Sequence, residues 1–155
     1  MGTRGMTLVE LMVGLVIFGI LVAVSLPAFR KYMSTQQVEG AANRMSGNLR
    51  LARQRAATEG NSYRITFDAA AQTYAILDDD NNNGLTDTGE TVLGPINIPA
   101  ELTVTNGPLV PFPGDTLVFY PNGRANVTGS LTLANSKGHS RMVFVVQSTG
   151  AVAVR

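Results

Sequence analysis

RGMTLVELMVGLVIFGILVAVSLPAFRKY, residues 4–32, places one acidic side chain, Glu10, at the start of a long apolar segment. Residues 11–29 carry no charge, and as a helix they would span roughly 28 Å at about 1.5 Å per residue. That length matches the hydrocarbon core of a bilayer, which is about 30 Å thick. A carboxylate in such a segment costs on the order of 2.5–3.5 kcal/mol unless it finds a partner. The stretch therefore predicts an N-terminal membrane helix whose one acid needs a partner.

The apolar segment differs from a cleaved secretory signal in its length and its ends. A secretory signal has about 7–15 apolar residues followed by a small-residue cleavage site. Here the segment is longer and ends in SLP, and the small residue Gly5 precedes it. Arg4 on one side faces Arg30 and Lys31 on the other, so basic residues do not set an orientation. From the residues alone, a plain single-pass anchor with a Glu near the membrane interface is one interpretation.

The string GMTLVELMV, residues 5–13, followed by a long apolar helix, resembles the class III signal of type IV pilins and pseudopilins. The resemblance implies that a prepilin peptidase cuts between Gly5 and Met6 and methylates the new amine. It also implies a bacterial inner-membrane prepilin that an inner-membrane assembly platform incorporates, with other pilins or pseudopilins, into an extracellular or periplasmic filament. The family fold is a lollipop, a long N-terminal α-helix whose second half packs on a small antiparallel sheet.

The same resemblance gives Glu10 a partner. In a filament, Glu10 of one subunit would meet the N-terminal ammonium of Met6 on a neighbour, and a buried acid is tolerable when it is paired. Gly19 and Pro27 both weaken a helix, and in filaments of this family the segment between the equivalent positions tends to unwind. A static kink in one transmembrane helix remains the alternative for these two residues.

Helical periodicity continues beyond the membrane segment. Apolar residues recur every three or four positions on one face, which predicts a stripe that covers a sheet. The members of this stripe are Val38, Ala42, Met45, Leu49, Ala52 and Ala56. The four arginines at positions 44, 50, 53 and 55 are expected to form a solvated surface beside it. Gly60-Asn61 supplies a stop signal for the helix.

Beyond residue 60 the apolar period becomes two, which is typical of strands. The expected strands lie at 62–67, 73–77, 102–105, 116–120, 130–134, 141–147 and 151–154. One long helix followed by antiparallel strands predicts the α+β class. The expected organisation is a leader peptide at 1–5, a transmembrane and filament-core helix at 6–29, and a globular head at 30–155.

Three longer segments narrow the resemblance. They resemble the GspH/FimT type of minor pilin and pseudopilin, and their sequences are LRLARQRAATEGNSYRITF, LVFYPNGRANVTGSLTL and RMVFVVQSTGAVAV. The chain has no cysteine, whereas many major pilins close a C-terminal loop with a disulfide. The resemblance implies a low-abundance subunit of a complex that primes a type IV pilus, or of the piston-like pseudopilus of type II secretion. A major pilin with the same fold remains an alternative.

The acidic segment DDDNNNGLTDTGE, residues 78–90, matches the calcium-loop pattern D-x-[DN]-x-[DN]-G-x5-E when counted from Asp79. The candidate ligands are Asp79, Asn81, Asn83, the Leu85 carbonyl, Asp87 and Glu90. No Lys or Arg occurs between Arg64 and Arg124 to neutralise them. The flanks are a strand-like segment and a proline-containing one, which differ from the helices of an EF-hand, so a metal-free turn rich in Asp and Asn is favoured. A calcium-binding membrane-anchored module is the alternative, and no other cofactor is expected.

Catalytic motifs are lacking. His139 is the only histidine, it stands in the turn-like segment NSKGHSR, and no triad fragment accompanies it. The sequence also has no Walker-type or Rossmann glycine loop. We therefore expect a protein that is not an enzyme.

DNA binding is the main functional alternative, because FimT-like minor pilins can serve in DNA uptake. Once the leader with Arg4 is removed, 11 basic residues face 11 acidic ones. Non-specific DNA binding needs several clustered Lys and Arg side chains on phosphates, so this alternative is the weaker one. Its candidate patch consists of Arg124, Lys137, Arg141 and Arg155.

Overall fold

The computed structural model describes residues 7–106 and 115–155. The chain divides into two compact units, Met1–Thr35 and Gln36–Arg155, and the single helix α1 (Leu8–Glu59) contributes to both. α1 ends where the stop signal predicted, because Gly60 adopts a left-handed φ of 82° and its N–H donates to the Ala56 carbonyl.

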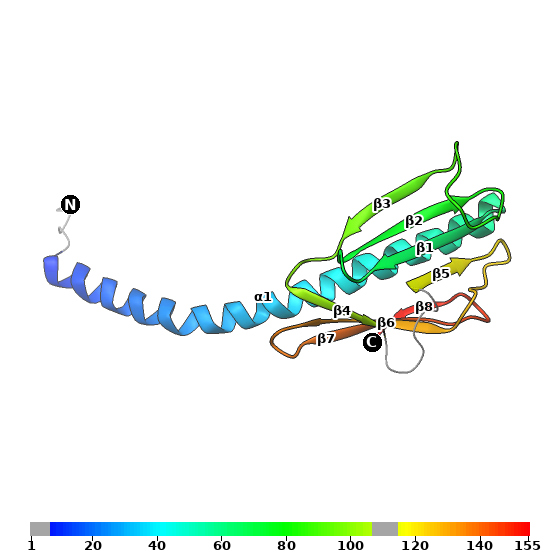
Figure 1. The fold of residues 1–155 in the computed structure, drawn as a ribbon. Helices are drawn as coiled ribbons and strands as arrows, with labels where there is room; N and C mark the ends of the chain where they lie inside the picture. Colours follow the sequence, from blue (N-terminus) through cyan, green and yellow to red (C-terminus); the bar gives the residue numbers. More distant parts are fainter. Residues whose placement is uncertain (1–6, 107–114) are drawn as a thin grey trace, which may run out of the picture. The chain divides into compact units, whose positions relative to one another are not determined.

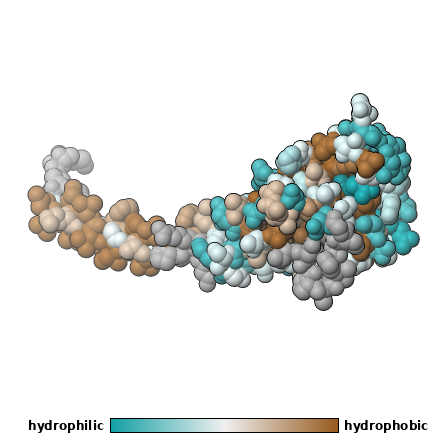
Figure 2. Space-filling model, viewed as in Figure 1, coloured by the Kyte–Doolittle hydropathy of each residue, from teal (hydrophilic) through white to brown (hydrophobic). Residues whose placement is uncertain are grey.

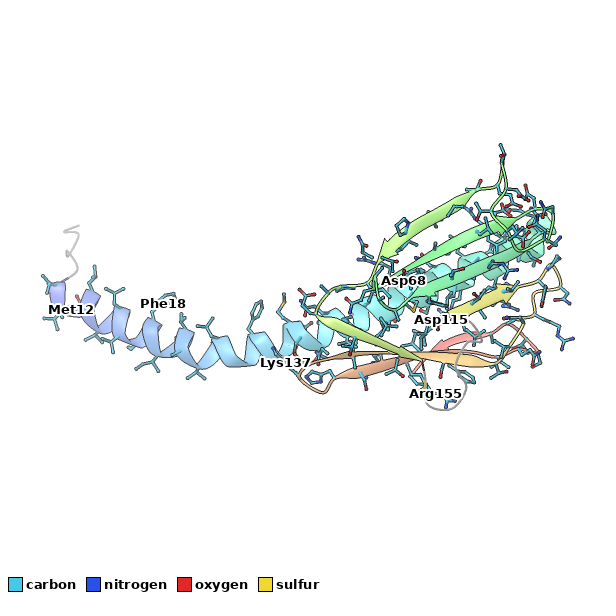
Figure 3. All side chains as sticks on the ribbon, viewed as in Figure 1. Met12, Phe18, Asp68, Asp115, Lys137 and Arg155 are labelled. Carbon is cyan, nitrogen blue, oxygen red and sulfur yellow. The ribbon has the colours of Figure 1, made fainter. Side chains whose placement is uncertain are left out.

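The first unit carries a candidate membrane span, Leu8–Leu26, which by length and composition is apolar enough to cross a bilayer. Its large apolar side chains, Met12 and Phe18 among them, are exposed and point away from the helix axis (Figure 3). The space-filling view shows the same part of α1 as a nearly continuous hydrophobic surface (Figure 2). The hydroxyl of Ser25 donates to the Leu21 carbonyl at 2.7 Å, so the helix itself satisfies this polar group.

The second unit holds two four-stranded antiparallel sheets together with the second half of α1 (Figure 1). The strands are β1 (Ser62–Asp68), β2 (Thr73–Asp79), β3 (Val92–Asn97), β4 (Leu102–Asn106), β5 (Thr116–Phe119), β6 (Gly129–Asn135), β7 (Ser140–Val145) and β8 (Val152–Val154). Their orders are β3-β2-β1-β5 and β4-β6-β7-β8. The predicted α+β class is confirmed, but the strands form two antiparallel sheets where a single sheet was expected.

Strand β3 was not predicted from the sequence. Gly94 and Pro95 interrupt the alternation expected of a strand, and Pro cannot donate a ladder hydrogen bond. The structure accommodates them because β3 is an edge strand, paired within the described part of the chain with β2 alone. The register of this pairing is irregular between Tyr74 and Ile76. Most of β3 is exposed.

The predicted apolar stripe of α1 is confirmed as the centre of the core. All six of its residues, from Val38 to Ala56, are buried. They form one cluster with inward-facing residues of both sheets. The most fully buried of the sheet residues are Ile65, Leu102, Leu117, Phe119, Leu133, Val143 and Val145. The alanines of the stripe allow the helix to approach the strands closely, as their small size suggested.

Candidate functional site

At the start of α1, Thr7 and Glu10 form a capping box. The Glu10 N–H donates to Thr7 Oγ1 at 3.2 Å, and the Thr7 N–H donates to Glu10 Oε2 at 3.0 Å. The Thr7 hydroxyl also donates to the same carboxylate oxygen at 3.1 Å. A Thr-x-x-Glu sequence satisfies two otherwise unpaired N–H groups at a helix start. Glu10 therefore has a structural task within one chain, which the sequence interpretation overlooked although the T-x-x-E pattern was visible.

The other residues predicted for processing and assembly give less information. Gly5 and Met6 lie outside the described residues. Gly19 has no neighbouring atoms around the position of a Cβ, and the backbone at Pro27 is helical. α1 is thus continuous through both positions in a single chain, and unwinding between them stays a prediction about the filament.

The loop after β2 is organised around Asp79, which is only 1% exposed. Asp79 Oδ2 accepts a hydrogen bond of 2.8 Å from the N–H of Gly84, a residue with φ of 77°. Arg64 Nη2 lies 3.8 Å from the same oxygen. No basic residue lies near Asp79 in the sequence, but the fold brings Arg64 to it. Antiparallel pairing sets Arg64 on β1 opposite Leu77 on β2, two residues before Asp79.

Further along the loop, Asp87 accepts hydrogen bonds from two asparagines. Asn81 Nδ2 and Asn83 Nδ2 both donate to Asp87 Oδ2, at 2.7 and 2.5 Å, and these bonds lower the pKa of Asp87. The Asp87 N–H donates to Glu90 Oε2 at 2.9 Å. Among residues 7–106 and 115–155, no three His, Cys, Asp or Glu side chains are grouped to hold a metal by themselves. A cation here would depend on amide and backbone oxygens as well.

A second acidic group joins the end of α1 to β1 and β2. The Tyr63 hydroxyl lies 2.5 Å from Glu59 Oε2 and 2.8 Å from Asp78 Oδ2. Burial raises the pKa of Tyr63, and the two neighbouring carboxylates raise it further by a smaller amount. Asn61 Nδ2 donates to Asp80 Oδ1 at 2.5 Å, and partial removal from water, with the charges of Asp78 and Glu90 nearby, raises the pKa of Asp80. These contacts link helix and sheet without a basic partner.

The four basic residues of the candidate DNA patch do not share one place on the sheet. Arg124 lies in the turn between β5 and β6. The N–H of the next residue, Ala125, donates to the backbone carbonyl of Gln147, which follows the end of β7. Lys137 lies in the β6–β7 turn, and the backbone of Arg155 pairs with Met142 of β7. Figure 3 shows Lys137 and Arg155 at separate places on the head. Arg141 Nη2 donates to Glu39 Oε1 of α1 at 2.5 Å. The structure therefore separates Arg124 from the other three and pairs Arg141 with an acid.

Two arginines of α1 hold sheet residues through their backbone carbonyls. Arg50 Nη2 donates to the Val152 carbonyl of β8 at 3.0 Å. Arg53 Nε donates to the Gly123 carbonyl of the β5–β6 turn at 3.0 Å. The prediction of a merely solvated surface was wrong for these two residues. They connect the helix to the C-terminal strand and its neighbouring turn.

Replacing Arg53 with Ala is expected to lower the free energy of unfolding by about 1–2 kcal/mol, because it leaves the Gly123 carbonyl without its charged donor. The measurement is urea unfolding of the full chain in a non-ionic detergent, followed by circular dichroism. Arg55→Ala is the matched control, since Arg55 lies on the other side of the helix and is exposed. Its expected effect is within about 0.5 kcal/mol, and equal losses in both variants would contradict the role given to Arg53.

A surface groove of about 230 Å³ lies between the second half of α1 and four residues of the head, namely Tyr74 of β2, Asn97 of β3, Ile98 just after β3, and Leu133 of β6. Its lining includes Arg44 but no carboxylate, imidazole or thiol. The Tyr74 hydroxyl accepts a hydrogen bond of 2.7 Å from Asn48 Nδ2, and burial raises the pKa of Tyr74. The lining of the groove therefore contains polar groups but no pairing of a nucleophile with a general base.

Comparison with known families gives two matches. The family model described as "Type II transport protein GspH" matches residues 41–150. The model described as "Prokaryotic N-terminal methylation motif" matches residues 1–26. Comparison with curated protein sequences gives no significant match.

Several solved structures share the fold. The minor pseudopilin EpsH from the Type 2 Secretion System of Vibrio cholerae has a TM-score of 0.58 and 14% identity, over 77% of this chain and 96% of that one. The type IV minor pilin FimU of Pseudomonas aeruginosa has a TM-score of 0.56 and 17% identity, over 80% and 92%. The solution structure of GspH from E. coli has a TM-score of 0.56 and 17% identity, over 79% and 89%.

At such identities the structural likeness shows the fold, and the family match carries the assignment. The GspH model extends from the second half of α1, through both sheets, to the turn before β8. The methylation motif covers the helix start with its Thr7–Glu10 capping box. The chain belongs to the GspH family of type II transport proteins.

Proposed function

We propose that this protein is a minor structural subunit of a type II secretion pseudopilus or a type IV pilus, anchored by α1 in the membrane before assembly. The observation that carries the proposal is the joining, in one chain, of an N-terminal methylation motif on an apolar helix to a head of the GspH family. The fold neighbours support it, since EpsH is a minor pseudopilin and FimU a type IV minor pilin. Family and fold are those of structural subunits rather than enzymes.

The parts of the chain take separate tasks in this proposal. A prepilin peptidase cleaves after Gly5 and, in a second step, methylates the freed amine of Met6. The exposed apolar surface of Leu8–Leu26 then passes from lipid into the bundled centre of a filament. Glu10 then exchanges its contacts within the chain for the neighbour's ammonium. The head remains outside the bundle, and Figure 2 shows hydrophilic residues on its surface, interspersed with hydrophobic patches.

The distribution of basic residues favours this structural role over DNA uptake. Phosphate binding strengthens with the number of Lys and Arg side chains that contact one strand. Here Arg141 is paired with Glu39, and Arg124 lies apart from Lys137 and Arg155. Salt-sensitive DNA binding by the purified protein is the result that would favour the competence alternative.

The test of the proposed function is mass spectrometry of the N-terminal peptide in filaments sheared from cells that make the protein. We expect a methylated peptide that begins at Met6, at trace level relative to the most abundant subunit. A dominant level would identify a major pilin instead. An intact Met1 or Gly2 start found only in membranes would overturn the filament assignment and leave a plain anchored domain.

A further inference from the structure

Two buried carboxylate oxygens in the loop after β2 lack hydrogen-bond partners. They are Asp79 Oδ1 and Glu90 Oε1. Each carboxylate uses its other oxygen on a backbone N–H of the loop, Asp79 on Gly84 and Glu90 on Asp87. Buried polar atoms normally have partners, so a pair of unpartnered anionic oxygens in one short loop needs an explanation. The buried carboxylate of Asp79 in particular is costly unless a cation accompanies it.

These two residues are positions one and twelve of the pattern D-x-[DN]-x-[DN]-G-x5-E. In loops of this pattern, position one supplies one carboxylate oxygen and position twelve supplies two. The hydrogen bond from Gly84, position six, to Asp79 brings the chain sharply back after position five. The sequence pattern and the unpartnered oxygens are independent observations, and both identify the same two residues.

The intervening positions of the pattern also lie together. Asn81, Asn83 and Asp87, positions three, five and nine, are joined by the bonds of both amides to Asp87 Oδ2. The side-chain oxygens of these asparagines accept backbone N–H groups of the loop, Asn81 Oδ1 from Asn83 at 2.9 Å and Asn83 Oδ1 from Leu85 at 2.6 Å. An amide oxygen has two lone pairs, so each of these oxygens keeps one lone pair for a cation.

The one basic neighbour does not complete this set. Arg64 Nη2 stands 3.8 Å from Asp79 Oδ2, beyond hydrogen-bond distance, and Arg64 Nε is itself buried without a partner. The guanidinium lies against Gly84, where an added Cβ would overlap it. Among the described residues Arg64 is paired with Asp79 alone, and residues 78–90 carry five carboxylates, so the loop keeps a net negative charge.

We propose that residues 79–90 bind one Ca²⁺ ion through Asp79, Asn81, Asn83, the Leu85 carbonyl, Asp87 and Glu90. Calcium takes six to eight oxygens in a flexible arrangement, whereas Mg²⁺ requires near-ideal octahedral geometry and gives up its water reluctantly. Two of the ligands are neutral amides, which places the affinity among the weaker calcium loops, with a Kd of about 0.1–1 mM. The bound ion would fix the connection between β2 and the edge strand β3.

The test is calcium titration of the full chain in a non-ionic detergent, with calorimetry and thermal unfolding as readouts. We expect one site, and a rise in Tm on the order of 5 °C at a tenfold excess over Kd. A chelator should reverse the rise, and Mg²⁺ at the same concentration should give less than about half of it. Absence of both heat and a Tm shift at about 10 mM Ca²⁺ would overturn the proposal and leave Arg64 as the cation of this loop.

Two variants separate a specific site from diffuse negative charge. Glu90→Gln removes the ligand at position twelve and should weaken binding by about tenfold or more. Asp80→Asn removes one negative charge from position two, which supplies no ligand, and should change Kd by less than about threefold. Equal weakening in the two variants would show general attraction of calcium to an acidic surface and would contradict the proposed site.

Discussion

Glu10→Gln is expected to reduce incorporation of the protein into filaments by about 100-fold while leaving it helical and stable in the membrane. Glutamine at the third helical position can still complete a capping box with Thr7. It cannot supply the charge that pairs with the ammonium of a neighbouring Met6. Removing one partner of a buried ion pair costs about 3–5 kcal/mol, and about 1.4 kcal/mol is a factor of ten in an equilibrium constant.

The capping box provides the matched control for this prediction. Thr7→Ala removes the side-chain bonds between Thr7 and Glu10 but keeps the carboxylate. Loss of such a cap costs about 1 kcal/mol of helix stability, so assembly should fall by less than tenfold. Glu10→Ala removes both functions and should resemble Glu10→Gln in assembly.

The measurement is the ratio of protein in sheared filaments to protein in membranes, by quantitative immunoblot, for the wild type and the three variants. Circular dichroism of each purified variant in detergent checks that α1 persists. If Thr7→Ala abolished assembly and Glu10→Gln preserved it, helix capping rather than charge pairing would be the role of Glu10. Equal assembly of all four proteins would remove both roles.

Local periodicity explains why the helix and its buried face could be predicted. The apolar residues from Val38 to Ala56 follow the 3.6-residue repeat of a helix, so their burial against a sheet can be predicted from spacing alone. Gly60 marks the helix end because it adopts a left-handed φ that glycine takes without strain. Strand β3 could not be found in the same way. Its place at an edge, which tolerates Pro95, depends on the pairing with β2 rather than on its own sequence.

Apart from the local Thr7–Glu10 capping box, the contacts that sequence reasoning missed join distant parts of the chain. Arg53 reaches Gly123 and Arg50 reaches Val152 only because the sheets pack against α1. Arg64 reaches Asp79 only through the register of β1 and β2. An arginine in a helix pattern looks the same whether it is solvated or bound to a carbonyl, since the acceptor is backbone and carries no sequence signal.

The candidate site likewise combines local features, which the sequence displays, with tertiary contacts, which it does not. The T-x-x-E pattern at Thr7 and the calcium-loop pattern from Asp79 are local, and both were readable from the sequence. The unpartnered oxygens of Asp79 and Glu90 are tertiary, because they depend on how the loop folds over the end of β2. Whether the basic residues of the candidate DNA patch lie together also depends on the strand order, which the sequence does not give. The structure separates Arg124 from Lys137.

Gly150→Ala is expected to lower the free energy of unfolding by about 3 kcal/mol, because this residue lies where three parts of the head meet. Gly150 has φ of 61°, and its N–H donates to the Val146 carbonyl at 2.7 Å to close the β7–β8 turn. A Cβ built there would overlap the Gly123 carbonyl oxygen and lie 2.8 Å from Arg53 Nε. The expected loss combines left-handed strain of about 1–2 kcal/mol with overpacking of about 1–3 kcal/mol.

Gly138→Ala isolates the first of these two contributions. Gly138, in the β6–β7 turn, has a left-handed φ of 83° but no atom within 4 Å of its built Cβ. Its substitution should therefore cost only the backbone strain, about 1 kcal/mol. Urea unfolding of both variants in detergent, at equal detergent concentration, gives the difference directly. A difference near zero would mean that Gly123 and Arg53 move aside freely. A difference of about 2 kcal/mol would show that the Gly123 carbonyl and the Arg53 side chain are held in place beside Gly150 and cannot give way to a methyl group.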